Sequence, residues 1–312
     1  MTYKLKSIFS LLIFLTGVFI LYGQQNLELK VGSYNIRYDN QGDRDKGDGW
    51  EHRLPVISSI IHWEDVDVFG AQEVLAHQLE GMLEELPAYD AYGIGRDDGK
   101  KKGEYAPVFF KRDKFTLLDS GSFWLSETPE KPSKGWDASL PRICSWVHLK
   151  EKESGKTFWY FNLHLDHRGI KAREESCLLV LEKMKEMVGK GTAFLTGDFN
   201  VDQHTDMYDV LHDSQWIYDA YESADKRMAW NGTFNAFDDQ LWTESRIDHI
   251  FTTENVKVSH YAVLTETYRS DEGEKGDIKK GDFPEEYSFK RYKSRLPSDH
   301  FPIFARVSLQ LN

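Results

Sequence analysis

Strand-like and helix-like stretches alternate along the first part of the chain. Residues 27–36 and 66–71 are short apolar runs, as expected for strands. Residues 50–62 and 76–86 instead carry apolar side chains at helical spacing, and Pro87 ends the second of these stretches. Polar side chains follow each of the two strands. This order predicts a layered α/β fold in which polar groups gather at strand ends.

The remainder of the chain adds more strands and one long helix. Residues 157–165 are apolar at nearly every position, which predicts a strand buried on both faces. Residues 170–188 form the clearest helix, with Leu178 assigned to its apolar stripe and Gly189 as its end. Further strands are expected at residues 106–110, 115–124, 142–150, 192–200, 246–251, 256–265 and 303–309.

Two stretches depart from this pattern. Residues 1–23 begin with two lysines, continue with a short apolar run and end at Gly23, which is typical of a secretory signal peptide. An uncleaved anchor is the alternative, but an apolar run of about 15 residues is shorter than the ~20 that a spanning helix needs. We therefore predict export to the periplasm or the cell exterior. Residues 268–295 are charged and lack apolar periodicity, so they predict a surface insertion within a single domain of residues 24–312.

Composition narrows the class of protein. The chain has 312 residues, of which 40% are hydrophobic, so it can fill a substantial core. Its net charge is −12 and becomes more negative when the lysines of the signal peptide are removed. Phosphate neutralisation supplies most of the affinity for long nucleic acids, so this charge disfavours a nucleic-acid groove. A local basic patch or a bound divalent cation could still reverse the sign at one site.

The chain has two cysteines, Cys144 and Cys177. A disulfide between them is possible in an exported protein. Their positions in an apparent strand and an apparent helix instead favour two buried free thiols.

Polar side chains recur at the ends of the predicted strands. Asp198 and Asn200 end one of them, and side chains two positions apart on an extended chain face the same side. The same Asp-x-Asn sequence is also a common turn. Each of the other residues could have a purely structural role, such as capping a helix. Strand ends converge in layered α/β sheets, so the whole set indicates one site. Its members are Asn35, Glu73, Glu104, His164, Asp198, Asn200, Asp248, Asp299 and His300.

The chemistry of this set is consistent. Carboxylate and amide oxygens suit a hard cation such as Mg²⁺ or Mn²⁺, and the sequence shows no Cys/His spacing for structural zinc. A histidine beside a carboxylate can be held as a positively charged donor. A metal, hydrogen-bond donors and an activated water are the groups needed to attack a phosphate ester.

These motifs, in this order, resemble those of the endonuclease/exonuclease/phosphatase superfamily, which has the DNase I-like fold. The resemblance implies a four-layer α/β/β/α sandwich, in which two mostly antiparallel sheets are flanked by helices. Two further runs, residues 123–126 and 164–167, are similar to an exported bacterial branch of this superfamily. The motifs are Ser33-Tyr34-Asn35-Ile36, Gln72-Glu73, Glu104-Tyr105, Asn162-Leu163-His164, Gly197-Asp198-Phe199-Asn200, Arg246-Ile247-Asp248-His249-Ile250 and Ser298-Asp299-His300-Phe301-Pro302.

The resemblance implies a metal side and a water side of the site. Glu73 would be the main metal ligand, with Asn35 beside it and Asp299 supporting the metal. Asp198 would orient or deprotonate the attacking water. Asn200 would hold a phosphate oxygen.

The resemblance also implies two histidine pairs. Asp248 would pair with His300 and make that imidazole a stabiliser of charge on the phosphorus. His164, with Glu104 as its partner, would match a second pair that some branches of the superfamily lack. Such positioning and charge stabilisation are what phosphoryl transfer requires.

Other residues are candidates for substrate contact. Arg142 could hold a second, non-reacting anionic group through its guanidinium fork, or it could be a surface residue of a strand. Tyr105 lies beside Glu104 in its motif. The tryptophans of the loops that flank the site strands could line a cleft for sugar, lipid or base, or could simply pack. They are Trp124, Trp136 and Trp230.

The sequence therefore predicts an exported, Mg²⁺-dependent phosphoesterase that cleaves a phosphodiester or a phosphomonoester by metal-assisted attack of water. The acidic chain favours a small or membrane-derived substrate, and we expect a monomer without a stable protein partner. One alternative is a secreted endonuclease that acts on DNA or RNA. Another is a catalytically dead binding module on the same fold, which would require a missing catalytic residue, and none is missing.

Overall fold

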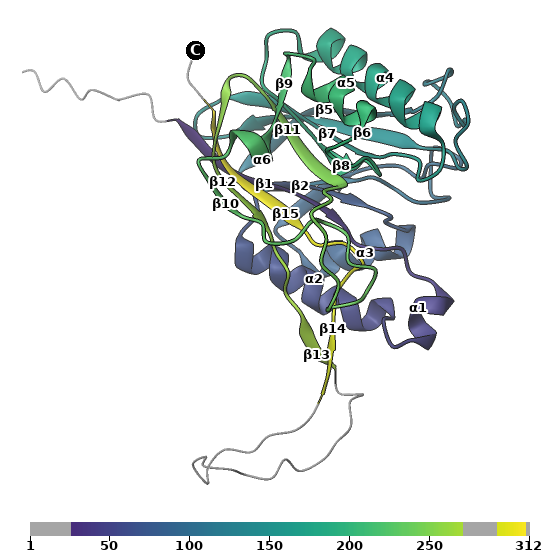
Figure 1. The fold of residues 1–312 in the computed structure, drawn as a ribbon. Helices are drawn as coiled ribbons and strands as arrows, with labels where there is room; N and C mark the ends of the chain where they lie inside the picture. The colour runs from purple at the N-terminus through teal and green to yellow at the C-terminus, as the bar shows by residue number, and fades with distance from the viewer. Residues whose placement is uncertain (1–25, 271–291, 310–312) are drawn as a thin grey trace, which may run out of the picture.

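The computed structural model describes residues 26–270 and 292–309. Two large β-sheets pack face to face, and helices cover their outer faces (Figure 1). This arrangement confirms the predicted α/β/β/α sandwich. The predicted signal peptide lies outside the described residues. None of the helices within the described ranges is long and apolar enough to cross a membrane.

The first sheet has seven strands in the order β10-β12-β15-β1-β2-β4-β3. The pairs β1/β2 and β10/β12 are parallel, and the other neighbours are antiparallel. The short strands β3 and β10 carry little apolar pattern and were not expected from the sequence. The strands are β1 Leu27–Asn35, β2 Val68–Gln72, β3 Tyr89–Tyr92, β4 Val108–Lys111, β10 Lys226–Met228, β12 Val256–Val263 and β15 Ile303–Leu309.

The second sheet has six strands in the order β5-β6-β7-β8-β11-β9. Only its pair β7/β8 is parallel. The strands are β5 Phe115–Trp124, β6 Ile143–Glu151, β7 Thr157–His164, β8 Ala193–Asp198, β9 Ile217–Asp219 and β11 Asp248–Thr253.

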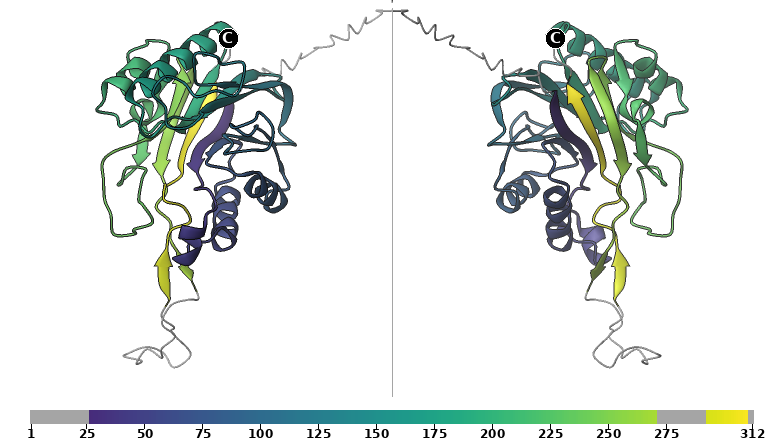
Figure 2. Two further views of the ribbon diagram at one scale, coloured as in Figure 1. Left: turned by 90° about the vertical axis from the view of Figure 1, so that its right-hand side faces the viewer. Right: turned by 90° about the vertical axis from the view of Figure 1, so that its left-hand side faces the viewer.

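Helices form the outer layers on both sides of the two sheets (Figure 2). Helices α2 (Trp50–Glu64) and α3 (Ala76–Glu85) pack on the first sheet, and α4 (Ile170–Val188) and α5 (Asp206–His212) pack on the second. Two short helices, α1 and α6, join neighbouring elements. They span Gln41–Asp45 and Ala220–Ser223.

The predicted surface insertion begins and ends with a small antiparallel ribbon. Its strands are β13 (Tyr268–Ser270) and β14 (Lys293–Arg295). Residues 271–291 between them lie outside the described residues.

The core between the sheets explains why β7 is apolar on both faces. Phe158 and Tyr160 point toward the first sheet and pack with Val31, while Phe161 and Leu163 point toward α4. Burying one such side chain contributes about 1.5–3 kcal/mol to stability. The central strands are thus clamped between two apolar layers, which gives the site a rigid base.

Helix α4 has the predicted bounds but not the predicted apolar stripe. Leu178 is 48% exposed, so its assignment to that stripe was wrong. At 100° per residue Leu178 lies well to one side of the line through Cys177, Leu181 and Met184, all of which are buried. Cys144 and Cys177 are both buried free thiols, which confirms the interpretation that their positions favoured.

Strand register brings the predicted polar residues to one edge of the sandwich. In the second sheet Asp198 is paired with His164 on β7 and with Asp248 on β11. In the first sheet Asn35 is paired with Gln72, and Glu73 follows directly. Because the two sheets face each other, these two rows meet at the same edge.

A buried polar connection fixes the two sheets beneath this edge. Asn162 on β7 donates hydrogen bonds to the carbonyls of Ala71 (2.8 Å) and Pro107 (3.0 Å). Its own side-chain oxygen accepts from Gln72 Nε2 at 2.6 Å. A Cβ at Gly70 would lie 2.2 Å from that oxygen, so only glycine permits this approach. The fully paired buried amide of Asn162 specifies one relative placement of the sheets.

Candidate active site

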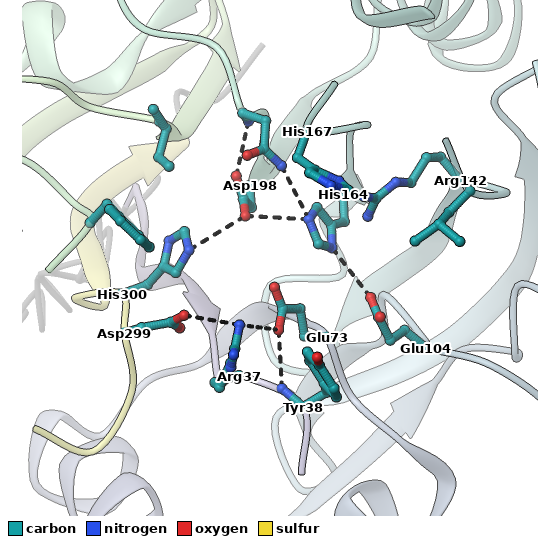
Figure 3. Close-up of a pocket in the computed structure, with 14 residues that line it drawn as sticks. Arg37, Tyr38, Glu73, Glu104, Arg142, His164, His167, Asp198, Asp299 and His300 are labelled. Carbon is teal, nitrogen blue, oxygen red and sulfur yellow. Dashed lines mark hydrogen bonds and ion pairs between the residues drawn. The ribbon is translucent and has the colours of Figure 1, made fainter. Parts of the chain in front are cut away.

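One pocket of about 450 Å³ lies at the edge where the two rows meet (Figure 3). Most of the residues expected from the sequence line it, and Asn35 and Asp248 lie directly behind them. The lining residues are Arg37, Tyr38, Glu73, Glu104, Leu140, Arg142, His164, His167, Asp198, Asn200, Phe234, Ile247, Asp299 and His300.

Asp198 stands at the centre of the polar network. Its Oδ2 accepts a hydrogen bond from Asn35 Nδ2 at 2.9 Å and lies 3.4 Å from His164 Nε2 and 3.7 Å from His300 Nε2. Burial raises the pKa of Asp198 to about 7. A carboxylate with a pKa near neutrality is well matched to accepting a proton from water.

Asn200 forms a turn and also lines the pocket. Its backbone N–H donates to Asp198 Oδ1 at 2.9 Å, and its φ is 49°, so β8 ends in a turn closed by the aspartate. Its amide nitrogen lies 3.2 Å from His164 Nε2 and donates to the carbonyl of Leu165 at 3.1 Å. The turn and the site interpretations of Asp-x-Asn therefore both describe this segment.

The predicted pair of Asp248 and His300 is present. His300 Nδ1 lies 2.8 Å from Asp248 Oδ2, and both side chains are buried. Burial opposes protonation of His300, but the carboxylates of Asp248 and Asp198 outweigh it and hold the pKa of the imidazole well above its usual value. His300 is therefore a cation that faces the pocket.

The predicted pair of His164 and Glu104 is looser than expected. The closest approach, from His164 Nδ1 to Glu104 Oε2, is 3.7 Å, which is too long for a hydrogen bond. Glu104 instead accepts two hydrogen bonds from the Arg96 guanidinium, at 2.6 and 2.9 Å. Burial and the charges of Arg142 and Arg96 lower the pKa of His164 well below its usual value. His164 is thus a neutral imidazole, unlike His300.

Glu73 holds a strained position at the pocket floor. It has a positive φ of 59°, which is uncommon for a residue other than glycine. Its Oε1 accepts from Asn35 Nδ2 at 3.2 Å and its Oε2 from the Tyr38 backbone N–H at 3.1 Å. These contacts aim the carboxylate at Asp198 across the pocket.

The expected metal-binding residues, Glu73, Asn35 and Asp299, are only partly brought together. Arg37 Nη1 lies 3.2 Å from Asp299 Oδ2 and 4.0 Å from Glu73 Oε2, so its guanidinium stands between the two carboxylates. Ligand atoms of Glu73, His164 and Asp198, by contrast, all lie within 4.8 Å of one another. The two carboxylates suit a hard divalent cation, and the geometry favours Asp198 over Asp299 as the partner of Glu73.

Arg142 is not a surface residue, which was the alternative left open by the sequence. It is only 4% exposed. Its Nη2 lies 3.1 Å from His167 Nδ1 and its Nε lies 3.4 Å from Asp166 Oδ2. Its Nη1 has no partner among the described residues, although it is buried. A fixed guanidinium at the pocket wall, with one donor nitrogen unpaired, can bind an anionic group.

Tyr105 and Trp124, both candidates for substrate contact, do not line the pocket, and for Trp124 the structure supports the packing alternative. The hydroxyl of Tyr105 donates to the Lys100 carbonyl at 3.0 Å. The indole N–H of Trp124 donates to the Arg96 carbonyl at 2.7 Å. Both rings are buried, and Trp124 supports the arginine that binds Glu104.

Several lining residues were not among the sequence candidates. Arg37 and Tyr38 directly follow the strand that carries Asn35, so their position along the chain was an available signal. The apolar lining residues carry no such signal, because they resemble core residues in sequence. These are Leu140, Phe234 and Ile247.

The fold is that of the DNase I-like class, and its pocket places acidic metal-binding candidates opposite a charged histidine. The chain belongs to the endonuclease/exonuclease/phosphatase family, whose profile matches residues 32–300. Members of this superfamily are phosphoesterase hydrolases that typically use a divalent metal.

Two solved structures from Bacteroides thetaiotaomicron are similar over most of the chain. One is an endonuclease/exonuclease/phosphatase family protein that is 50% identical, with a TM-score of 0.85, covering 92% of this chain and 100% of that one. The other is a mannosyl-6-phosphatase that is 51% identical, with a TM-score of 0.82, covering 89% of this chain and 99% of that one. An uncharacterised protein of Acanthamoeba polyphaga mimivirus is 28% identical over 218 residues, which cover 66% of this chain and 80% of that protein.

Proposed function

We propose that this protein is an exported, metal-dependent phosphatase that hydrolyses a phosphomonoester of a sugar. The observation that carries the proposal is the meeting of three kinds of group in one pocket. Carboxylates suited to a cation, a cationic imidazole and a guanidinium with an unused nitrogen all face the same cavity. A phosphate is the anion that can use all three at once.

The chain's own residues have distinct tasks in this mechanism. Asp198 positions the water and takes its proton, and His300 stabilises the negative charge that develops on the phosphoryl oxygens. Arg142 binds a phosphate oxygen through its free nitrogen. Its contacts with Asp166 and His167 keep the guanidinium in place. A divalent cation, expected to be Mg²⁺ or Mn²⁺ in its place, would be held by Glu73 and Asp198 and would supply Lewis acidity at the phosphate.

Two features support a small sugar substrate. The cavity of about 450 Å³ falls within the range for small-molecule sites. A protein that is 51% identical over most of the chain is a mannosyl-6-phosphatase. Together with the signal-peptide pattern of residues 1–23, these features favour a hexose 6-phosphate that is encountered outside the cytoplasm.

A substrate panel tests this proposal. Purified protein is assayed with Mg²⁺, with Mn²⁺ and with EDTA on hexose 6-phosphates, inositol phosphates, bis-p-nitrophenyl phosphate, sphingomyelin and plasmid DNA. We expect release of phosphate from a hexose 6-phosphate, abolished by EDTA and restored by excess Mg²⁺. Faster nicking of the plasmid would support the endonuclease alternative. A folded protein without metal-dependent turnover on any compound would support the binding-module alternative.

Arg142→Lys tests the phosphate-binding role of the guanidinium. Lysine keeps the charge but loses the planar fork, and a charge-assisted hydrogen bond contributes about 1.5–3 kcal/mol. We expect kcat/KM for the phosphomonoester to fall by about 10-fold to 100-fold, mainly through a higher KM. Arg112→Lys is the matched control, because Arg112 is an exposed residue paired with Asp90 outside the pocket. Equal kinetics of both variants would contradict the assignment.

A further inference from the structure

The segment between β10 and β11 exposes an unusual amount of aromatic surface. Within it Trp230 is 87% exposed and Trp242 is 69% exposed, and the neighbouring Leu241 is also exposed. An exposed indole leaves a large apolar face in water, and two in one short segment suggest a surface that binds a ligand. We call Trp230, Leu241 and Trp242 the aromatic platform.

Hydrogen bonds across the segment hold the aromatic platform in a defined shape. Trp242 Nε1 donates to the Trp230 carbonyl at 2.7 Å, and the Gly232 N–H donates to the Thr243 carbonyl at 2.6 Å. A Cβ at Gly232 would lie 2.0 Å from the carbonyl oxygen of Ser245, so glycine is required for this close pairing. The tryptophans are therefore presented by a braced loop, which lowers the entropy cost of binding.

The same segment is joined to the catalytic groups. Thr233 Oγ1 accepts a hydrogen bond from the Asp248 N–H at 3.0 Å, and the Thr233 carbonyl accepts one from the Phe301 N–H at 2.7 Å. Phe234 lines the pocket, and its ring centroid is 5.1 Å from that of His300. Four residues of chain span at most about 14 Å, so Trp230 lies close to the pocket wall.

The charge around the aromatic platform limits the classes of ligand that it can bind. Asp238, Asp239 and Glu244 are exposed in the same segment, and its one basic residue, Arg246, is buried against Asp219. Carboxylates beside the tryptophans repel the phosphates of nucleic acids and anionic lipids. They can accept hydrogen bonds from hydroxyl groups, while indole faces pack against the apolar C–H face of a sugar ring.

We propose that the aromatic platform binds the sugar units attached to the phosphorylated one, so that the preferred substrate is a phosphorylated oligosaccharide. This inference rests on the proposed sugar-phosphatase function and extends it beyond the pocket. The pocket receives the phosphorylated hexose, and the platform contacts the rest of the glycan.

A ratio of rates tests the inference. We measure kcat/KM for a hexose 6-phosphate and for a trisaccharide that ends in the same phosphorylated hexose. The unmodified protein is expected to favour the trisaccharide by about 10-fold or more, and the doubly substituted Trp230→Ala, Trp242→Ala protein is expected to lose this preference. Trp63→Ala is the matched control, because Trp63 on α2 is 86% exposed and belongs neither to the aromatic platform nor to the pocket lining. A preference that survives the double substitution overturns the inference.

A binding measurement separates this inference from the proposed function. Calorimetric titration with the unphosphorylated trisaccharide requires no catalysis. We expect binding that is lost in the Trp230→Ala, Trp242→Ala protein and kept in the Trp63→Ala protein. Absence of binding to the unmodified protein, or tryptophan-dependent sedimentation with anionic vesicles instead, overturns the platform assignment. Absence of hydrolysis of all phosphate esters, with sugar binding intact, overturns only the phosphatase function.

Discussion

His300→Ala is expected to lower kcat by about 10³-fold, because it removes a cationic imidazole that faces the pocket. The Asp248 carboxylate, 2.8 Å from Nδ1, and the Asp198 carboxylate, 3.7 Å from Nε2, both keep His300 protonated in the folded protein. Charge on the phosphoryl oxygens grows as the reaction proceeds, so the loss falls on the transition state. KM should change much less than kcat. Steady-state kinetics on the best phosphate ester measures both values.

Two controls separate chemistry from folding. His260→Ala removes an exposed histidine on β12 and should leave kcat unchanged. Thermal unfolding of His300→Ala shows whether the unpaired, buried Asp248 destabilises the protein, and kcat is then compared well below the melting temperature. A folded His300→Ala protein that keeps more than a tenth of its kcat would contradict the role assigned to this residue.

Glu73→Gln is expected to raise the Mg²⁺ concentration needed for half-maximal activity by about 100-fold or more. Loss of residues that merely support a metal ligand typically costs 10-fold to 100-fold, and Glu73 is the expected ligand itself. The amide keeps the size of the side chain and can still accept one of the two hydrogen bonds, from Asn35 or from Tyr38, but it removes the negative charge. Activity and calorimetric binding are both measured as functions of Mg²⁺ concentration.

The comparison with Asp299→Asn makes this experiment sharper. Arg37 stands between Asp299 and Glu73, so we expect Asp299→Asn to shift the Mg²⁺ requirement less than Glu73→Gln does. Glu80→Gln is the neutral control, since Glu80 is exposed on α3. A larger shift from Asp299→Asn would make Asp299, not Glu73, the main metal ligand and would indicate that Arg37 moves when the metal binds.

Much of the site followed from patterns along the chain. The apolar runs of β7, β8 and β11 place their ends at one edge, and the polar residues just there were predicted to converge. The structure pairs Asp198 with His164 and Asp248 across those strands. The prediction succeeded because each polar residue stands where an apolar run stops, and strand ends converge in layered α/β sheets.

Expectations failed where folding decided which group a polar side chain would contact. Tyr105 and Trp124 stand next to site motifs, but their polar atoms donate to the carbonyls of Lys100 and Arg96, and neither side chain lines the pocket. Glu104 is beside His164 as expected, yet Arg96 takes its hydrogen bonds. In each case the sequence around a residue cannot show which group forms the hydrogen bond with its side chain, because the competing groups meet only after folding.

By itself, then, the sequence determined a layered α/β fold and the polar residues that gather at strand ends, because apolar periodicity is a local property. The sandwich of two sheets followed from the resemblance of its ordered motifs to a known superfamily. Tertiary structure alone decided the burial of Arg142, the intervening position of Arg37 and the opposite charge states of His164 and His300. It also exposed Trp230 and Trp242 together beside the pocket. These features depend on burial and on the distances between charges, which are set by contacts between residues far apart along the chain.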